Sequence, residues 1–140
     1  MTIDGVLRSL LKWIAPSRQA ARHVARGRRA ERRGRVEDAC RHYRAAIATD
    51  PDHAQAHLDL GIALEAMGDV PAALASFELA LARDPGNAYA AYNLGKALFV
   101  RGDLGRAEAL LRAAVAGKRD FPEALVVLAS VLDARGELEG

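Results

Sequence analysis

A pattern of 34 residues repeats along this 140-residue chain without a shift of register. Three complete copies occupy residues 20–53, 54–87 and 88–121, and a fourth copy over residues 122–140 stops part-way. In the second copy the recurring positions are Leu60, Gly61, Leu64, Gly68, Asp69, Ala73, Phe77, Ala80 and Pro85. A sequence of this kind predicts an array in which each unit contacts only its neighbours, rather than a catalytic globule.

Each copy has the pattern of two helices joined by a tight turn. In the second copy, apolar residues follow helical spacing as far as Gly68, which tolerates the left-handed conformation that closes a helix, and Asp69 can cap the next helix. Gly61, Ala73 and Ala80 are small enough to let the two helices approach closely. The equivalent structural positions are Ala39, Tyr43, Ala46 and Pro51 in the first copy and Leu94, Gly95, Ala107, Leu111 and Ala114 in the third. We therefore predict antiparallel helical hairpins that stack on one another.

These positions and their period resemble the tetratricopeptide repeat (TPR) family, whose pattern is W-x2-L-G-x2-Y, then A-x3-F, then P. The resemblance extends over residues 20–140 and is to arrays of the bacterial type. It implies an all-α fold, a right-handed α-α superhelix (TPR solenoid) of antiparallel hairpins. It also implies that the first helices of successive hairpins line a concave groove that binds a partner polypeptide.

The resemblance nominates groove residues by their offsets within the repeat. These are Gln55, Asp59 and Ile62 in the second copy and Tyr89, Tyr92, Asn93, Lys96 and Phe99 in the third. Aromatic side chains supply large contact areas, and Tyr89, Tyr92 and Phe99 occupy offsets without a packing requirement, so we expect a peptide or helix site. Asn93, and less closely Asp59, match the family position that hydrogen-bonds the main chain of an extended peptide. The alternative is that the aromatics pack against the neighbouring repeat.

One class of TPR ligand is disfavoured by the groove offsets. Co-chaperones of the family hold the acidic C-termini of heat-shock chaperones with Lys, Asn and Arg side chains. This chain has Val24, Arg28, Asp59, Tyr89 and Asn93 at those offsets. Because Asp59 would repel an acidic tail, we expect a protein or peptide ligand with a basic or apolar segment.

Residues 1–35 differ from the rest of the chain in charge. They hold ten Lys or Arg against Asp4 and Glu31, a net charge of +8, whereas residues 36–140 have a net charge of −6. Apolar residues recur at helical spacing near the start, with basic residues opposite and a tryptophan near the boundary. They are Val6, Leu7, Leu10, Leu11 and Ile14, opposite Arg8 and Lys12, with Trp13 at the edge. We expect a basic amphipathic helix over residues 1–19.

Three roles remain open for this N-terminal segment. It can pack on the first repeat, bind an anionic membrane surface or a partner through residues 1–35, or contact nucleic acid. Nucleic acid is the least favoured, because no aromatic residue interleaves the arginines. In the first copy, Arg26 and Arg29 replace residues that are apolar in the other copies, which predicts a solvent-adapted terminal repeat.

The last segment does not have the composition of a terminal cap. Residues 124–132 are almost all apolar, whereas the last helix of a solenoid normally has a polar outer face. We expect only the first helix of a fourth hairpin, a turn at residues 133–137, and a natural chain that continues past Gly140. The alternative is that the apolar helix is covered by self-association.

The sequence contains no motif for catalysis, a cofactor or a metal. It has no Gly-rich phosphate loop, nucleophile elbow or Cys/His metal spacing. His53 falls in a turn between hairpins and His57 at a packing position. Cys40 is the single cysteine, so we expect a packing role and a reducing compartment.

We therefore expect a non-catalytic scaffold or adaptor that binds a partner polypeptide in the groove. We expect it in the cytoplasm, or peripherally on the cytoplasmic face of a membrane. One alternative is the N-terminal substrate-recruiting arm of a larger transferase, either an O-GlcNAc-transferase-like glycosyltransferase or a sulfotransferase. The other is a membrane-surface adaptor anchored by residues 5–14.

Overall fold

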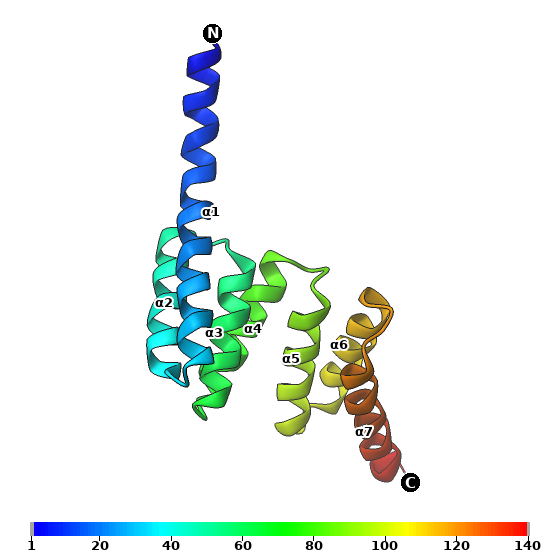
Figure 1. Cartoon of the computed structure of the whole chain (residues 1–140). Coiled ribbons are helices and arrows are strands. Elements are labelled where there is room, and N and C mark those ends of the chain that lie inside the picture. Colours follow the sequence, from blue (N-terminus) through cyan, green and yellow to red (C-terminus); the bar gives the residue numbers. More distant parts are fainter. Residues whose placement is uncertain (1, 140) are drawn as a thin grey trace.

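The computed structural model describes the backbone of residues 2–139 and the side chains of residues 2–137 (Figure 1). Seven helices follow one another in this part of the chain, and it contains no strand. They are α1 (Ile3–Arg32), α2 (Val36–Thr49), α3 (Ala54–Ala66), α4 (Val70–Arg83), α5 (Ala88–Val100), α6 (Leu104–Gly117) and α7 (Pro122–Glu139). The predicted all-α superhelical fold is confirmed.

The hairpins form where the repeat pattern predicts them. Gly34, Gly68 and Gly102 close the first helix of each hairpin with φ of 73°, 86° and 87°, a conformation that glycine adopts without strain. The Asp69 and Asp103 carboxylates then accept hydrogen bonds from backbone N–H groups in the first turns of α4 and α6. The turn and the cap together reverse the chain and begin the second helix.

A glycine faces a large buried side chain inside each hairpin. A Cβ placed on Gly61 would lie 2.5 Å from Cε1 of Phe77, and a Cβ on Gly27 would lie 2.4 Å from Cε1 of Tyr43. The Tyr43 hydroxyl donates a 2.6 Å hydrogen bond to Glu31, and burial raises the pKa of that hydroxyl. The other buried repeat positions are Ala39, Ala46, Leu60, Ala73, Ala80, Leu94, Ala107, Leu111 and Ala114. The two helices of a hairpin can therefore approach each other closely, because the residue that faces the large side chain is a glycine.

The hairpins stack so that the second helix of each one packs against the first helix of the next. The odd-numbered helices lie along one side of the array (Figure 1). Pro51 and Pro85 lie exposed in the connections between hairpins. This arrangement gives the molecule one surface made only from α1, α3, α5 and α7.

α1 is one continuous helix of 30 residues, so the segment 1–19 and the first helix of the first repeat are not separate elements. Its buried residues begin at Ala20, and its first half extends beyond the other helices (Figure 1). Pro16 lies inside the helix although proline lacks the N–H that the helix would use there. Arg26 and Arg29 are exposed.

The prediction of a turn at residues 133–137 is wrong, because α7 continues through these residues as far as Glu139. Gly136 is not among the glycines with positive φ. The other turns are held by a following helix that packs back on the first, whereas no helix follows α7 in the described residues. Arg135 instead forms an ion pair with Glu108 of α6, which binds the end of α7 to the array.

Candidate peptide-binding groove

The junction between the first two repeats is linked by charged side chains on the odd-numbered helices. The Arg28 guanidinium on α1 donates a 2.7 Å hydrogen bond to one carboxylate oxygen of Asp59 on α3. The Gln55 amide donates a 2.8 Å hydrogen bond to the other oxygen. The hydrogen bond to Asp59 raises the pKa of Arg28, and Asp59 is only 8% exposed. The charge of Asp59, from which repulsion of an acidic ligand was expected, is therefore compensated by Arg28.

A second link joins the second and third repeats. The Lys96 ammonium on α5 lies 3.1 Å from a carboxylate oxygen of Glu65 on α3. The same ammonium lies 5.7 Å from the ring centroid of Tyr92. Both charged side chains are about one-third exposed, so the pair lies at the groove surface and contributes little stability by itself.

Aromatic side chains link the third repeat to α7. The rings of Tyr89 and Tyr92 lie 5.2 and 5.0 Å from that of Phe121, centroid to centroid. Lys118 donates a 2.7 Å hydrogen bond to the Tyr89 hydroxyl, which raises the pKa of Lys118, and its ammonium lies 4.5 Å from the Tyr89 and Phe121 ring centroids. We call these four residues the aromatic cluster. The expectation that Tyr89 and Tyr92 have no packing role is wrong, because both pack on Phe121.

Phe121 and Lys118 were not among the predicted groove residues. Both lie in the connection between α6 and α7, where Arg119 occupies the position of the repeat proline and Pro122 comes three residues later. Phe121 is 3% exposed and fills the space at this altered junction. The displaced proline was the signal in the sequence that this junction needs contacts of its own.

Asn93 and the two histidines of α3 already have partners. The Asn93 amide nitrogen donates a 2.8 Å hydrogen bond to the backbone carbonyl of Tyr89 in its own helix. His53 caps α3 through Nδ1, and the buried His57 ring is 2.8 Å from the Pro51 carbonyl oxygen. In the part of the chain that the structure describes, no three His, Cys, Asp or Glu residues are grouped as metal ligands would be.

Apolar groups remain exposed between these links. Ile62 of α3 is 42% exposed, Tyr89 of α5 is 50% exposed, and Val126 of α7 is 67% exposed. Phe99 is partly buried against the core. A hollow of about 310 Å³ extends the same surface toward α1, and its lining includes Val24, Arg28, His53 and Gln55. The candidate groove therefore combines side chains that are linked at the junctions with exposed side chains, and Tyr89 belongs to both groups.

Comparisons with known proteins agree with this architecture. A family model described as a tetratricopeptide repeat matches residues 24–88, 58–124 and 92–140. No curated protein gives a significant sequence match. The first TPR of Spaghetti (RPAP3) bound to the HSP90 peptide SRMEEVD is 19% identical, with a TM-score of 0.82 over 86% of this chain and 95% of that chain.

Two further solved structures are similar at higher identity. MamA is 28% identical, with a TM-score of 0.73 over 79% of this chain and 65% of that chain. A mutant of the Thermobaculum terrenum O-GlcNAc transferase is 26% identical, with a TM-score of 0.76 over 84% of this chain but only 22% of that chain. The repeat pattern, the hairpin geometry and the family match agree, and the chain belongs to the tetratricopeptide repeat family.

Proposed function

We propose that the protein is a non-catalytic interaction module that binds a partner polypeptide along the surface of α3, α5 and α7. The exposed side chains of Ile62 on α3, Tyr89 on α5 and Val126 on α7 carry this proposal. Exposed apolar groups on a preformed surface lose water without a large ordering cost when a ligand covers them. The bound peptide in the similar Spaghetti domain supports the same use of the fold.

The charges in the groove favour a ligand with an apolar or basic segment over an acidic C-terminal tail. Arg28 is paired with Asp59, and Lys96 is paired with Glu65. Lys118 donates its hydrogen bond to Tyr89. An acidic ligand would have to compete with these partners for each cation, whereas an apolar segment needs none of them.

Peptide selection followed by matched substitutions tests the site. Peptides selected from a random phage-displayed library on the 140-residue protein would be labelled and titrated by fluorescence anisotropy. Ile62→Arg is expected to weaken binding by about 1–3 kcal/mol, because it places a charge where an apolar side chain is exposed to the ligand. Leu79→Arg is the control, because Leu79 is similarly exposed but lies on α4, outside the odd-numbered helices. Equal losses in both variants, or no selected peptide, would refute the proposed groove.

A second candidate is a repeat arm that recruits substrates for a larger transferase. The similarity to 22% of the Thermobaculum terrenum O-GlcNAc transferase chain favours it, since that enzyme carries this fold within a longer protein. An immunoblot of native lysate with an antibody against residues 36–121 distinguishes the candidates. A band near 15.0 kDa supports a free-standing module, and a much larger band supports the arm.

A further inference from the structure

The first half of α1 has an apolar surface that no other described helix covers. Ile3 is 79% exposed and Trp13 is 84% exposed. The same part of the helix exposes Val6, Leu7, Leu10, Leu11 and Ile14 to between 41% and 55%. This half of α1 projects past the other helices, so its apolar side chains face solvent in the isolated protein (Figure 1).

Arginines continue this surface along the second half of α1. Steps of three or four residues place side chains on one side of a helix, and such steps connect Leu7, Leu11, Ile14, Arg18, Arg22, Ala25, Arg29 and Arg32. All eight are exposed. Ala20, Val24 and Gly27, which are buried against the array, lie on the opposite side of the helix. The exposed side of α1 therefore changes from apolar to basic and faces away from the repeats. We call these eight residues the α1 stripe.

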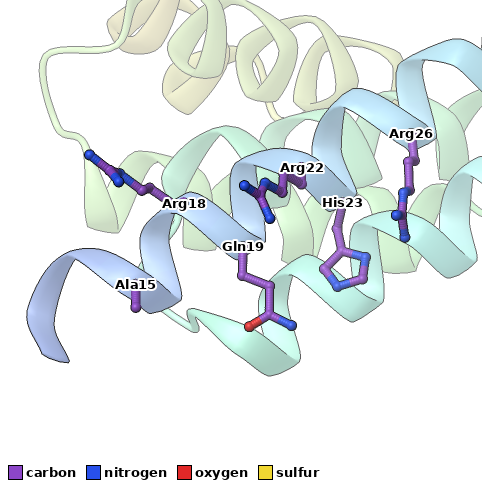
Figure 2. Close-up of a pocket in the computed structure, with 6 residues that line it drawn as sticks. All are labelled: Ala15, Arg18, Gln19, Arg22, His23 and Arg26. Atoms are coloured by element: carbon purple, nitrogen blue, oxygen red, sulfur yellow. The ribbon is translucent and has the colours of Figure 1, made fainter. Parts of the chain in front are cut away.

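A basic hollow lies beside the α1 stripe. It has a volume of about 420 Å³, and its lining includes Arg18, Arg22, Arg26 and His23. Figure 2 shows Gln19, His23 and Arg26 on the same side of the α1 ribbon. Nδ1 of His23 is buried, and no hydrogen-bond partner for it occurs in the described residues. The guanidinium groups that line this hollow are suitable partners for phosphate oxygens.

We propose that α1 docks the protein on an anionic lipid surface, with the apolar part of the α1 stripe among the acyl chains and its arginines against the lipid phosphates. Basic residues near such a surface gain about 1 kcal/mol each from its negative potential, and the first 35 residues have a net charge of +8. No described helix is long and apolar enough to cross a bilayer.

Charge and exposure favour a membrane over the other partners. A second copy of α1 would bring two strongly basic segments together, which is unfavourable without counter-charges. A nucleic acid would satisfy the arginines but would leave the apolar side chains, including Trp13, exposed. An anionic lipid surface offers a partner to both parts of the α1 stripe.

Trp13 supplies the test, because it is the single tryptophan of the chain and lies three residues from Leu10, at the edge of the apolar surface rather than in the α1 stripe. The emission of the 140-residue protein would be recorded with mixed phosphatidylcholine and phosphatidylglycerol vesicles and with pure phosphatidylcholine vesicles. We expect a blue shift, and quenching by brominated lipid, with the anionic vesicles only. The shift should weaken in high salt, because exposed charges are screened.

Two pairs of substitutions assign the contact to the α1 stripe. Arg22→Gln with Arg29→Gln should lower the partition coefficient by about fivefold for each arginine. Arg101→Gln with Arg119→Gln is the matched control, because both arginines are exposed outside α1. Leu7→Ser with Leu11→Ser should abolish the shift while the circular dichroism of the array is unchanged.

Four other results would overturn the proposal. Unchanged Trp13 emission with the anionic vesicles would do so, and so would equal losses in the α1 and control pairs. Tight binding of double-stranded DNA without vesicle binding would assign the arginines to nucleic acid. A dimer in sedimentation equilibrium that Leu7→Ser with Leu11→Ser dissociates would assign the apolar side chains to self-association.

Discussion

At the scale of single residues, the glycines of the chain serve opposite purposes. Gly61 has no room for a side chain, because Phe77 occupies the place of its Cβ. Gly105 is the second residue of α6, and a Cβ built on it would meet no atom within 4 Å besides its chain neighbours and the backbone of its own helix. The first glycine permits helix packing, whereas the second only increases the flexibility of the unfolded chain.

These two glycines make a matched pair for substitution. Gly61→Ala should lower the free energy of unfolding by about 1–3 kcal/mol, because Phe77 must leave its position. Gly105→Ala should raise it by about 0.5–1 kcal/mol, because alanine is the better helix former. Urea denaturation followed by circular dichroism measures both. A neutral Gly61→Ala would show that the contact between α3 and α4 is looser than the structure indicates.

At the scale of elements, α7 is held by two different contacts. The aromatic cluster packs its beginning against α5. Glu108 of α6 accepts a 2.9 Å hydrogen bond from Arg112 and pairs with Arg135 nearer the end of α7. The hydrogen bond from Arg112 is the larger cause of the lowered pKa of Glu108. Packing therefore holds the beginning and the middle of α7, where Leu128 and Val131 are also buried, and charge adds a contact nearer its end.

Removing the central ring should release the beginning of α7. Phe121→Ala should cost about 3–5 kcal/mol, because it leaves a cavity beneath Tyr89 and Tyr92. Hydrogen exchange should become faster in α7 while α3 and α4 keep their protection. Val126→Ala is the control, since Val126 is 67% exposed on the same helix. Uniform loss of protection in every hairpin would mean that the array unfolds as one unit.

The charged contact should depend on pH. A carboxylate with a lowered pKa stabilises the fold above its ordinary pKa of about 4.3, and this contribution is lost as the pH falls through the lower folded value. Glu108→Gln should therefore destabilise the protein at neutral pH and make no difference in strong acid. Denaturation of both proteins across this range tests the sign. A difference that does not change with pH would exclude a charge effect.

The sequence predicted single hairpins better than the contacts between them. Gly68 and Asp69 specify their turn locally, so the turn could be predicted. Phe121 meets Tyr89 and Tyr92 through the altered connection between α6 and α7, and the regular offsets of the repeat do not include that contact. Gly136 resembles the other turn glycines in sequence, but α7 continues through it as far as Glu139, and no described helix follows to pack back on α7. The residues at the junctions were therefore predicted from their offsets within the repeat, but their interaction partners were not predicted.

At the scale of the whole molecule, the two ends differ in charge and in the apolar residues that they expose. α1 concentrates basic residues at one end, and α7 leaves Leu125 and Val126 exposed at the other. The groove lies between them, and its cations are engaged by protein groups. A ligand therefore meets a surface that is close to neutral along α3 and α5.

This balance predicts weak affinity for acidic tails. The peptide SRMEEVD, which is bound in the similar Spaghetti structure, should show no saturable binding in fluorescence anisotropy at physiological salt. Arg28 and Lys96 would have to leave Asp59 and Glu65 to meet its carboxylates. Micromolar binding that is lost in Lys96→Ala, but kept in the exposed control Arg101→Ala, would show that the groove exchanges its partners readily.

The links across the junctions have a mechanical consequence. Arg28 with Asp59 and Lys96 with Glu65 each join two successive hairpins along the same surface that a ligand would cover, and the aromatic cluster joins α5 to the connection before α7. We expect a ligand that displaces one of these links to change the angle at which two hairpins meet. Ligand binding and the curvature of the array would then be coupled. Bending the array would change its affinity for the ligand, and a bound ligand would in turn change the pitch of the superhelix.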